Sequence, residues 1–160
     1  MILEKVDEKN FDEFFGLIIK LAEFEKLTPP DEAAKKRMKR HATQDNPYYE
    51  AYICRVDNKP IGYLFFFMSY SSFLGRPTLY LEDIFVLKEF RGKGYGKKMF
   101  NFLIKQAQDR DCGRMEWCAL KWNKKAIEFY EKMGAKPLDE WTYFRLTQDK
   151  FYEARVRNES

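Results

Sequence analysis

Hydrophobic residues in the first third of the chain follow strand and helix spacing and predict three elements. A short apolar segment at residues 2–6 favours a first strand. The segment after it repeats apolar residues every three or four positions, as one face of a helix does: Phe11, Phe14, Phe15, Ile18, Leu21 and Ala22. This spacing predicts a helix with a wide buried face. After Pro29 and Pro30, Asp31 is placed to cap a second helix toward Ala42, which has few apolar residues and should lie at the surface.

The middle of the chain has the composition of β-strands. Residues 49–56 and 60–70 are rich in aromatic and β-branched residues, and Asp57-Asn58-Lys59 separates them, so the pattern predicts an antiparallel hairpin. A third segment, residues 78–86, carries hydrophobic residues on both faces. That pattern is typical of a strand at the centre of a sheet that is covered on both sides.

Helical spacing returns at residues 97–110, and a strand is predicted at residues 115–120. Because a strand-helix-strand crossover is right-handed, the strand at 115–120 should run parallel to residues 78–86. A further helix is predicted at 124–133, closed by Gly134, and edge strands at 136–138 and 142–146. These elements indicate an α/β fold, and since no linker or repeat interrupts residues 1–160, we expect a single domain.

Composition and charge exclude several classes of protein. The chain has 160 residues, of which 45% are hydrophobic, but no apolar run is long enough to cross a bilayer. A net charge of +4 is mild for a nucleic-acid-binding domain, and we interpret the basic residues at 35–40 as a solvated helix face. The N-terminus has no hydrophobic signal-peptide core. We therefore expect a soluble, cytoplasmic protein that binds neither membranes nor nucleic acid.

The cysteines give no sign of a disulfide framework or a zinc site. Cys54, Cys112 and Cys118 form no C-x-x-C pair, and His41 is the single histidine. We expect all three thiols to be reduced and buried, with Cys118 in the core, and we expect no metal.

The six residues from Arg91 to Gly96 carry the most specific chemical signal. Glycines at 92, 94 and 96 leave backbone N–H groups uncovered and permit positive φ, and the following helix directs the positive end of its dipole to the same place. A phosphate-bearing ligand fits such a loop. A Rossmann fingerprint would need glycine or alanine in place of Lys97, and a Walker A loop would need serine or threonine in place of Lys98. The pattern that remains is R-x-x-G-x-G.

Two adjacent carboxylates, Glu82 and Asp83, interrupt the apolar segment at residues 78–86. Successive strand residues face opposite sides of a sheet, so at least one of the two should lie beside a cleft or in the interior. A buried carboxylate is costly unless it is paired or hydrogen bonded. Functional use at a cleft and a structural role toward loop amides are equally open on this evidence.

A second motif lies at residues 123–134, where Asn123 is placed to cap a helix and the sequence follows N-x-x-A-x-x-F-Y-x-x-x-G. Together with R-x-x-G-x-G before it, this motif resembles the GNAT superfamily of N-acetyltransferases. The resemblance implies a mixed, mostly antiparallel central sheet with helices on both faces and a parallel strand pair that splays at the cofactor site. It implies acetyl-CoA as the cosubstrate. The residues that it assigns to the cofactor are Ile84, Phe85, Val86, Arg91, Gly92, Lys93, Gly94, Tyr95, Gly96, Lys97, Asn123, Ala126 and Tyr130.

Residues 80–86, 91–96 and 122–130, together with 21–25, are similar to the spermidine/spermine acetyltransferase branch, which includes diamine and thialysine acetyltransferases. The resemblance implies a homodimer that acetylates a small aliphatic amine. Glu82 would deprotonate the amine, directly or through water, and Tyr130 would protonate the CoA sulfur. Phe24, Glu25 and Asp83 would line the acceptor site, where the two carboxylates would bind a second positive charge.

Elementary chemistry agrees with these roles, because an ammonium becomes a nucleophile only after it loses a proton to a base such as a carboxylate. A backbone N–H near Phe85 and Val86 is placed to stabilise the thioester oxygen. Residues 71–74 and 139–144 depart from the pattern of the branch, so thialysine, diamine, polyamine and aminoalkyl acid acceptors all stay open. Acetylation of a protein N-terminus or lysine, and a non-catalytic CoA-binding regulatory module, are the alternatives.

Overall fold

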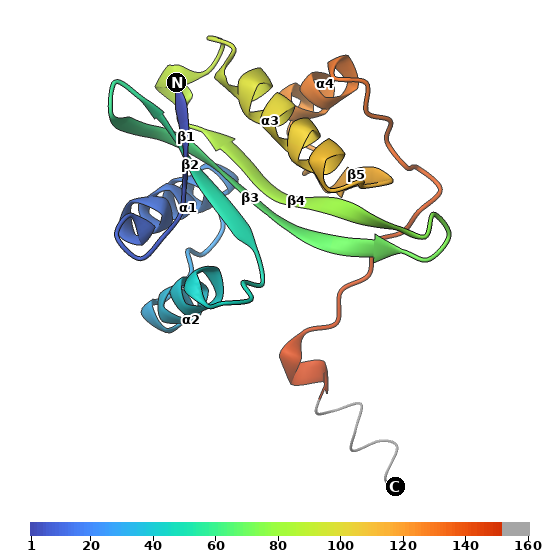
Figure 1. Cartoon of the computed structure of the whole chain (residues 1–160), viewed down its shortest axis with the longest axis horizontal. Coiled ribbons are helices and arrows are strands. Elements are labelled where there is room, and N and C mark those ends of the chain that lie inside the picture. The colour runs from blue at the N-terminus through green and yellow to red at the C-terminus, as the bar shows by residue number, and fades with distance from the viewer. Residues whose placement is uncertain (152–160) are drawn as a thin grey trace, which may run out of the picture. The chain divides into compact units, whose positions relative to one another are not determined.

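The computed structural model describes residues 1–151, and Figure 1 shows their arrangement. The elements in chain order are β1 (Ile2–Lys5), α1 (Phe11–Glu25), α2 (Glu32–Thr43), β2 (Glu50–Val56), β3 (Lys59–Ser71), β4 (Arg76–Val86), the 3-10 helix η1 (Lys88–Phe90), α3 (Tyr95–Asp109), β5 (Arg114–Trp117) and α4 (Lys124–Lys132). The chain forms two compact units. Met1–Cys118 contains the whole sheet, and α4 belongs to the unit that begins at Ala119.

The five strands form one mixed sheet in the order β1-β2-β3-β4-β5. The first three pairings are antiparallel, and the pairing of β4 with β5 is parallel. Asp57 and Asn58 connect β2 to β3 with φ values of 49° and 61°, the left-handed conformation that a two-residue hairpin turn requires. The predicted hairpin and the predicted parallel pair are both confirmed.

Helices cover both faces of this sheet. In Figure 1, α1 and α2 lie on one side of the sheet and α3 lies on the other. On the first side, the predicted apolar face of α1 is buried, with Phe11 and Phe14 fully inaccessible and packed in one cluster with Tyr63 and Phe85 of the sheet. On the second side, α3 buries the stripe Met99, Phe100, Leu103 and Ala107. This double cover explains why β3 and β4 are apolar on both faces.

The second helix is a surface helix, as its composition predicts. Asp31 caps α2 by accepting a hydrogen bond from the backbone N–H of Ala34 at 2.7 Å, and the helix has no buried residue. One of its basic residues, Lys35, forms an ion pair with Asp12 of α1 at 2.8 Å. Its basic character therefore serves in part to hold it beside α1.

The edge strands predicted at residues 136–138 and 142–146 are wrong, because neither segment is a strand in the structure. A strand needs a partner for its backbone groups, and within residues 1–151 the only strand that pairs with β5 is β4. Pro137 also lacks an N–H to donate. The residues from 141 to 146 are all exposed, so no buried face selects a pleated conformation for them.

The prediction of three buried thiols is also wrong in part. All three cysteines are free, but only Cys54 is buried, Cys112 is half-buried and Cys118 is exposed. Because β5 ends at Trp117, Cys118 lies just beyond the strand and outside the core. The Cys118 sulfur lies 3.5 Å from the hydroxyl oxygen of Tyr80, within hydrogen-bond distance.

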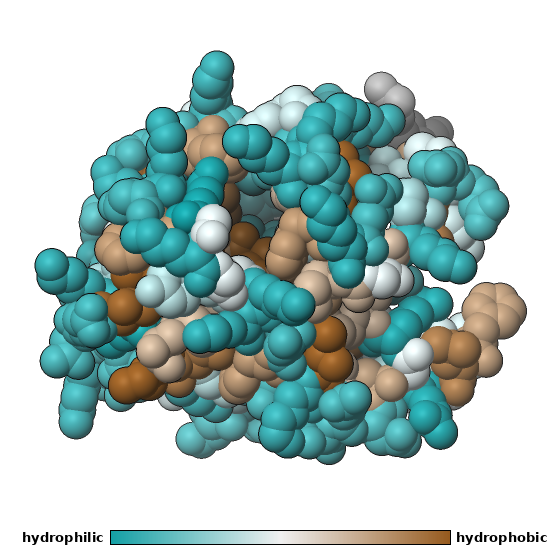
Figure 2. All heavy atoms as spheres, turned by 90° about the horizontal axis from the view of Figure 1, so that it is seen from above, coloured by the Kyte–Doolittle hydropathy of each residue, from teal (hydrophilic) through white to brown (hydrophobic). Residues whose placement is uncertain are grey.

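On the face that Figure 2 shows, hydrophilic side chains surround patches of hydrophobic ones. The end of β3 and the turn that follows it contribute exposed apolar residues, including Tyr70 in the strand and the fully exposed Phe73 in the turn. This turn contains the segment 71–74 that departs from the acetyltransferase branch. No helix among residues 1–151 is both long enough and apolar enough to cross a membrane.

Candidate active site

The parallel strands β4 and β5 pair over only part of their length. The ladder joins Thr78–Leu81 to Arg114–Trp117, whereas β4 continues to Val86. Within residues 1–151, the second half of β4 therefore has no strand partner on this edge. Its backbone N–H and C=O groups are left to bond with another extended group. This partial pairing agrees with the splayed parallel pair that the family resemblance implies.

A β-bulge sets the orientation of the two carboxylates in β4. Phe65 pairs with Asp83 and Phe66 pairs with Leu81, so Glu82 is an extra residue with no partner in β3. The strict alternation assumed from sequence therefore does not hold at this point. The prediction that at least one of the two carboxylates lies in the interior or beside a cleft still holds, since Glu82 is exposed and Asp83 is largely buried. A bulge next to a site is a common way to redirect one side chain.

Asp83 is held by a buried tyrosine. The Tyr63 hydroxyl donates a hydrogen bond to Oδ2 of Asp83 at 3.0 Å, and Tyr63 itself is inaccessible to solvent. The pKa of Asp83 is raised to about 6, chiefly by burial and in smaller part by the nearby charges of Glu82 and Glu25, while the Tyr63 hydrogen bond acts in the opposite direction. Sequence reasoning did not single out Tyr63, because a tyrosine in an apolar strand is typical of an ordinary core residue. The sequence carried no signal for it, because the place of Tyr63 opposite Phe85 depends on the register of β3 against β4.

Glu25 completes a cluster of three carboxyl groups. It is the last residue of α1, and burial raises its pKa. Its charge acts on both Asp83 and Tyr63, as does the charge of Glu82. Among the described residues, no lysine, arginine or histidine forms an ion pair with any of the three carboxylates. The cluster therefore presents uncompensated negative charge and favours a cationic ligand.

The glycine loop has the backbone conformation that an anion site requires. Gly92 and Gly94 have φ values of 74° and 81°, and α3 begins directly after Gly94. No side chain caps this helix, and no acidic residue lies in its first turn. A Cβ added at Gly92, Gly94 or Gly96 would meet nothing within 4 Å, so the loop faces open space. Uncapped N–H groups and the helix dipole are thus directed toward a place where a phosphate fits.

The second predicted motif folds as a capped helix. Asn123 Oδ1 accepts a hydrogen bond from the backbone N–H of Ala126 at 3.3 Å, which confirms the predicted cap. Tyr130 is half-buried on α4, and its ring centroid is 5.4 Å from that of Phe129. Tyr130 lies in the unit that begins at Ala119, while Glu82 lies in the sheet unit. The structure thus brings Glu25, Glu82 and Asp83 together within one unit, and the placement of Tyr130 beside them stays a prediction.

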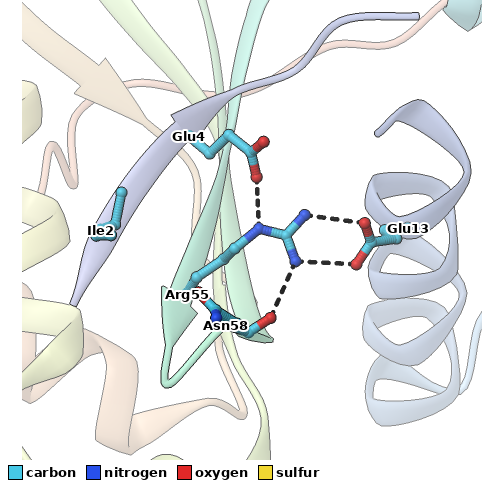
Figure 3. A pocket seen from close by; sticks show the side chains of 5 residues that line it. All are labelled: Ile2, Glu4, Glu13, Arg55 and Asn58. Carbon is cyan, nitrogen blue, oxygen red and sulfur yellow. Dashed lines mark hydrogen bonds and ion pairs between the residues drawn. The ribbon is translucent and has the colours of Figure 1, made fainter. Parts of the chain in front are cut away.

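A cavity on the sheet unit, shown in Figure 3, serves a structural purpose. Ile2, Glu4, Glu13, Arg55 and Asn58 line it, and Arg55 directs its guanidinium to Glu4 and Glu13. Each of the Nη atoms is 2.9 Å from a Glu13 oxygen, and one also reaches the carbonyl oxygen of Asn58 at 3.4 Å. Because Arg55 ties β1, α1 and the β2–β3 turn to one another, its donors are already used. None of the predicted site residues lies here.

No metal centre is formed by the part of the chain that the structure describes. Within residues 1–151 there is no group of three or more histidine, cysteine, aspartate or glutamate side chains arranged to hold a metal ion.

Residues 14–135 match the model of the acetyltransferase (GNAT) family. The chain belongs to the GNAT acetyltransferase family. The splayed β4 and β5 and the glycine loop at the start of α3 agree with this membership, and the protein is an N-acetyltransferase.

Its similar relatives include thialysine N-ε-acetyltransferases. This GNAT protein is 29% identical to the one from Bos taurus, over 96% of each chain. It is 28% identical to a spermidine/spermine N(1)-acetyltransferase-like protein of Homo sapiens over 88% of this chain and 22% of that one. An L-ornithine N5-acetyltransferase of Arabidopsis thaliana is 46% identical over 55% of this chain and 39% of its own length. The resemblance to the spermidine/spermine and thialysine branch is thereby confirmed.

Solved structures share the fold. An integron cassette protein of V. cholerae superposes with a TM-score of 0.82 at 20% identity, covering 96% of both chains. An aminoglycoside N-acetyltransferase solved in complex with CoA superposes with a TM-score of 0.70 at 19% identity, covering 91% of this chain and 93% of that one. Likeness at this level of identity establishes the α/β architecture of the GNAT protein and leaves its acceptor to be argued from the site.

Proposed function

We propose that the protein transfers an acetyl group from acetyl-CoA to the primary amine of a small acceptor that carries a second positive charge, as thialysine, diamines and polyamines do. The observation that carries this proposal is the cluster of Glu25, Glu82 and Asp83, whose charges no cation of residues 1–151 balances. A neutral or anionic acceptor would gain no electrostatic binding energy from this cluster. An acceptor with two positive charges would gain electrostatic binding energy at both of them.

The glycine loop and the free edge of β4 support acetyl-CoA as the donor. The N–H groups around Gly92–Gly96 and the start of α3 would bind the pyrophosphate, assisted by Lys93 and Lys97. Ile84, Phe85 and Val86 pair with β3 on one side, and on the edge of β4 that β5 does not reach their backbone would hold the extended pantetheine arm by strand-like hydrogen bonds. Asn123, Ala126 and Tyr130 would complete the cofactor site from α4. Bound acetyl-CoA supplies an activated acetyl thioester.

The three carboxylates would have different roles, one in deprotonation of the acceptor and two in its binding. Glu82, which the bulge leaves exposed, would take the proton from the ammonium, directly or through water. Glu25 and the Tyr63-anchored Asp83 would hold the second positive charge and orient the acceptor. A backbone N–H near Phe85 and Val86 would stabilise the negative charge on the thioester oxygen. Tyr130 would protonate the departing thiolate.

The first experiment compares acceptors that differ in one charge. Release of free CoA from acetyl-CoA is followed with 1,4-diaminobutane and with butylamine, which has the same chain and lacks the second amine, with a no-acceptor control. Thialysine, ornithine, spermidine and a lysine-containing peptide extend the panel. We expect kcat/KM to be at least about tenfold higher for the diamine, since one added ion pair in a partly buried site contributes on the order of 1.4 kcal/mol. Equal turnover of both amines, or turnover of the peptide alone, would contradict the proposal.

Variants of the two reacting groups test the assigned chemistry. Glu82→Gln removes the proton acceptor and should lower kcat by about 10²-fold or more, while acetyl-CoA binding is retained. Tyr130→Phe removes the proton donor and should lower kcat to a similar extent. Full turnover by both variants across the pH range at saturating substrate would remove this mechanism and leave the fold unaffected.

We further propose a homodimer, as the resemblance to the branch implies. We also propose a cytoplasmic location and a single GNAT domain, which follow from the missing signal-peptide core and the missing linker in the given sequence. The thialysine N-ε-acetyltransferase relatives match nearly the full length of the chain. Sedimentation equilibrium at micromolar concentration measures the mass directly. A species of 19.3 kDa would contradict the dimer.

A further inference from the structure

The side chain of Arg91 lies against the acceptor side of the site, although the motif that contains it is the cofactor loop. Its Nε donates a hydrogen bond to the carbonyl oxygen of Val86 at 2.8 Å. Its Cζ lies 4.3 Å from the centroid of the Phe24 ring and 5.6 Å from that of Phe85. The two rings are 6.4 Å apart. Arg91 therefore joins the end of α1 to the end of β4.

The contacts of Arg91 depend on the shape of its side chain. In the described part of the chain, no carboxylate forms an ion pair with it. The planar guanidinium stacks on a ring and donates through Nε at the same time, which a lysine ammonium cannot do. A lysine can lie over a ring, as Lys35 does over Phe15, but it has no planar group and no Nε, so it would keep the charge and lose the guanidinium stacking and this hydrogen bond. This difference separates a role in positioning from a role as a charge for the cofactor phosphates.

Phe24 connects Arg91 to the acidic cluster. It directly precedes Glu25, the final residue of α1, and the helix ends at Lys26 in the left-handed conformation. Phe24 and Glu25 thus lie in the last turn of α1, where no following turn of helix donates hydrogen bonds to hold the backbone. A contact that fixes the Phe24 ring holds the last turn of α1, and with it the backbone of Glu25, beside the end of β4.

We propose that Arg91 is a positioning residue for the amine acceptor: through Phe24 and the Val86 carbonyl, it holds Glu25 beside β4 so that the three carboxylates face one cation. This inference rests on the proposed function and goes beyond it. It assigns to the first residue of the cofactor motif a role in acceptor recognition. Since Gly92 follows Arg91 directly, the conformation of the loop and the shape of the acceptor site are linked through one side chain.

Arg91→Lys tests the proposal by separating acceptor binding from cofactor binding. We measure KM and kcat for 1,4-diaminobutane and, by calorimetry, Kd for acetyl-CoA. The acceptor KM should rise about tenfold, the size expected for the loss of one cation–π contact and one hydrogen bond, while kcat and Kd change less than about twofold. Arg110→Lys is the matched control. Arg110 also lies over an aromatic ring, 5.4 Å from Phe66, but pairs with Glu50 away from the cluster, so its acceptor KM should not change.

A double-mutant cycle with Phe24→Leu identifies the route. If Arg91 acts through the ring, Arg91→Lys should change the acceptor KM less than about twofold in the Phe24→Leu background. Multiplicative effects of the two substitutions would overturn the proposal. So would a weakened acetyl-CoA affinity with an unchanged acceptor KM, because that result makes Arg91 a cofactor ligand. An equal loss of affinity for the acceptor and for acetyl-CoA, together with a lower Tm, would show that Arg91 has only a structural role and would overturn the proposal.

The outcomes of this experiment differ from those that test the proposed function. Wild-type protein that acetylates no amine would overturn both proposals at once. Wild-type protein that prefers the diamine, combined with an Arg91→Lys variant of unchanged acceptor KM, would leave the proposed function standing and reject the role of Arg91 alone.

Discussion

Replacing Asp83 with asparagine should make the protein more stable at neutral pH while it impairs acceptor binding. Asp83 is largely buried and its pKa is raised from 3.8 to about 6, chiefly by burial. Below pH 3.8 the carboxyl is protonated in the folded and unfolded states alike. Between 3.8 and about 6 only the unfolded chain ionises, so the folded state binds more protons and its stability falls as pH rises. Above about pH 6 the Asp83 carboxyl is ionised in both the folded and the unfolded state, and the stability of the folded state falls no further.

The raised pKa sets the size of this effect. A shift of about two pH units at 1.36 kcal/mol per unit corresponds to about 3 kcal/mol of stability lost at pH 7. Most of this loss, about 2 kcal/mol, should develop between pH 4.5 and 7. Asparagine has almost the same shape, retains an oxygen that can accept the Tyr63 hydrogen bond, and does not ionise. The variant therefore keeps the contact without the penalty.

Urea denaturation of the wild type and Asp83→Asn at half-unit steps from pH 4.5 to 7 measures the difference directly. Carboxyls that do not interact with Asp83 titrate equally in both proteins and cancel in the difference, whereas Glu25 and Glu82 are coupled to Asp83 and belong to the measured effect. Asp45→Asn, at an exposed site, serves as the control for loss of one carboxylate. The free energy of unfolding of Asp83→Asn relative to the wild type should increase with pH by about 2 kcal/mol over this range. A difference that is independent of pH, or one that favours the wild type as pH rises, would refute the reasoning.

Two further substitutions test neighbouring parts of the site. Gly62→Ala should destabilise the protein by about 3 kcal/mol or more, because the added Cβ would lie 2.1 Å from the carbonyl oxygen of Phe85. Its control, Gly16→Ala, lies in open space on α1 and should stabilise the protein by about 0.5 to 1 kcal/mol. Urea denaturation compares the two variants, and equal changes in the free energy of unfolding would contradict the close approach at Gly62. Tyr63→Phe removes the hydrogen bond that lowers the pKa of Asp83, so that pKa should rise further and the acidic limb of kcat/KM for the diamine should move to higher pH. A profile that stays in place would show that Asp83 does not control acceptor binding.

The raised pKa of Asp83 supports the proposal that its neighbourhood is a site and not simply part of the core. A carboxylate that costs stability at neutral pH is retained only where its charge has a use, and buried groups with raised pKa values cluster at functional sites for this reason. Bound cationic acceptor would favour the ionised form and remove part of the cost. The diamine should therefore protect the wild type against denaturation more strongly at pH 7 than at pH 5.

The sequence by itself determined those features that depend on local pattern. The spacing of apolar residues located α1, α3 and the strands, Asp31 and Asn123 were recognised as helix caps, and Asp57-Asn58 marked the hairpin turn. The strand-helix-strand order predicted the parallel pair, and the glycine loop predicted the open start of α3. Each of these follows from backbone preferences and periodicity within a few residues, which is why one sequence suffices.

The tertiary structure alone decided how the candidate residues face one another. The bulge at Glu82 depends on the register of β3 against β4, and the Tyr63 contact with Asp83 depends on that same register. Arg91 belongs to a cofactor motif in sequence, yet its side chain reaches Phe24, which precedes it by more than sixty residues. The strands predicted at 136–146 were wrong because a strand exists only where another strand offers it hydrogen bonds. Pairing partners and contacts between distant segments are chosen by packing, and local sequence patterns do not record them.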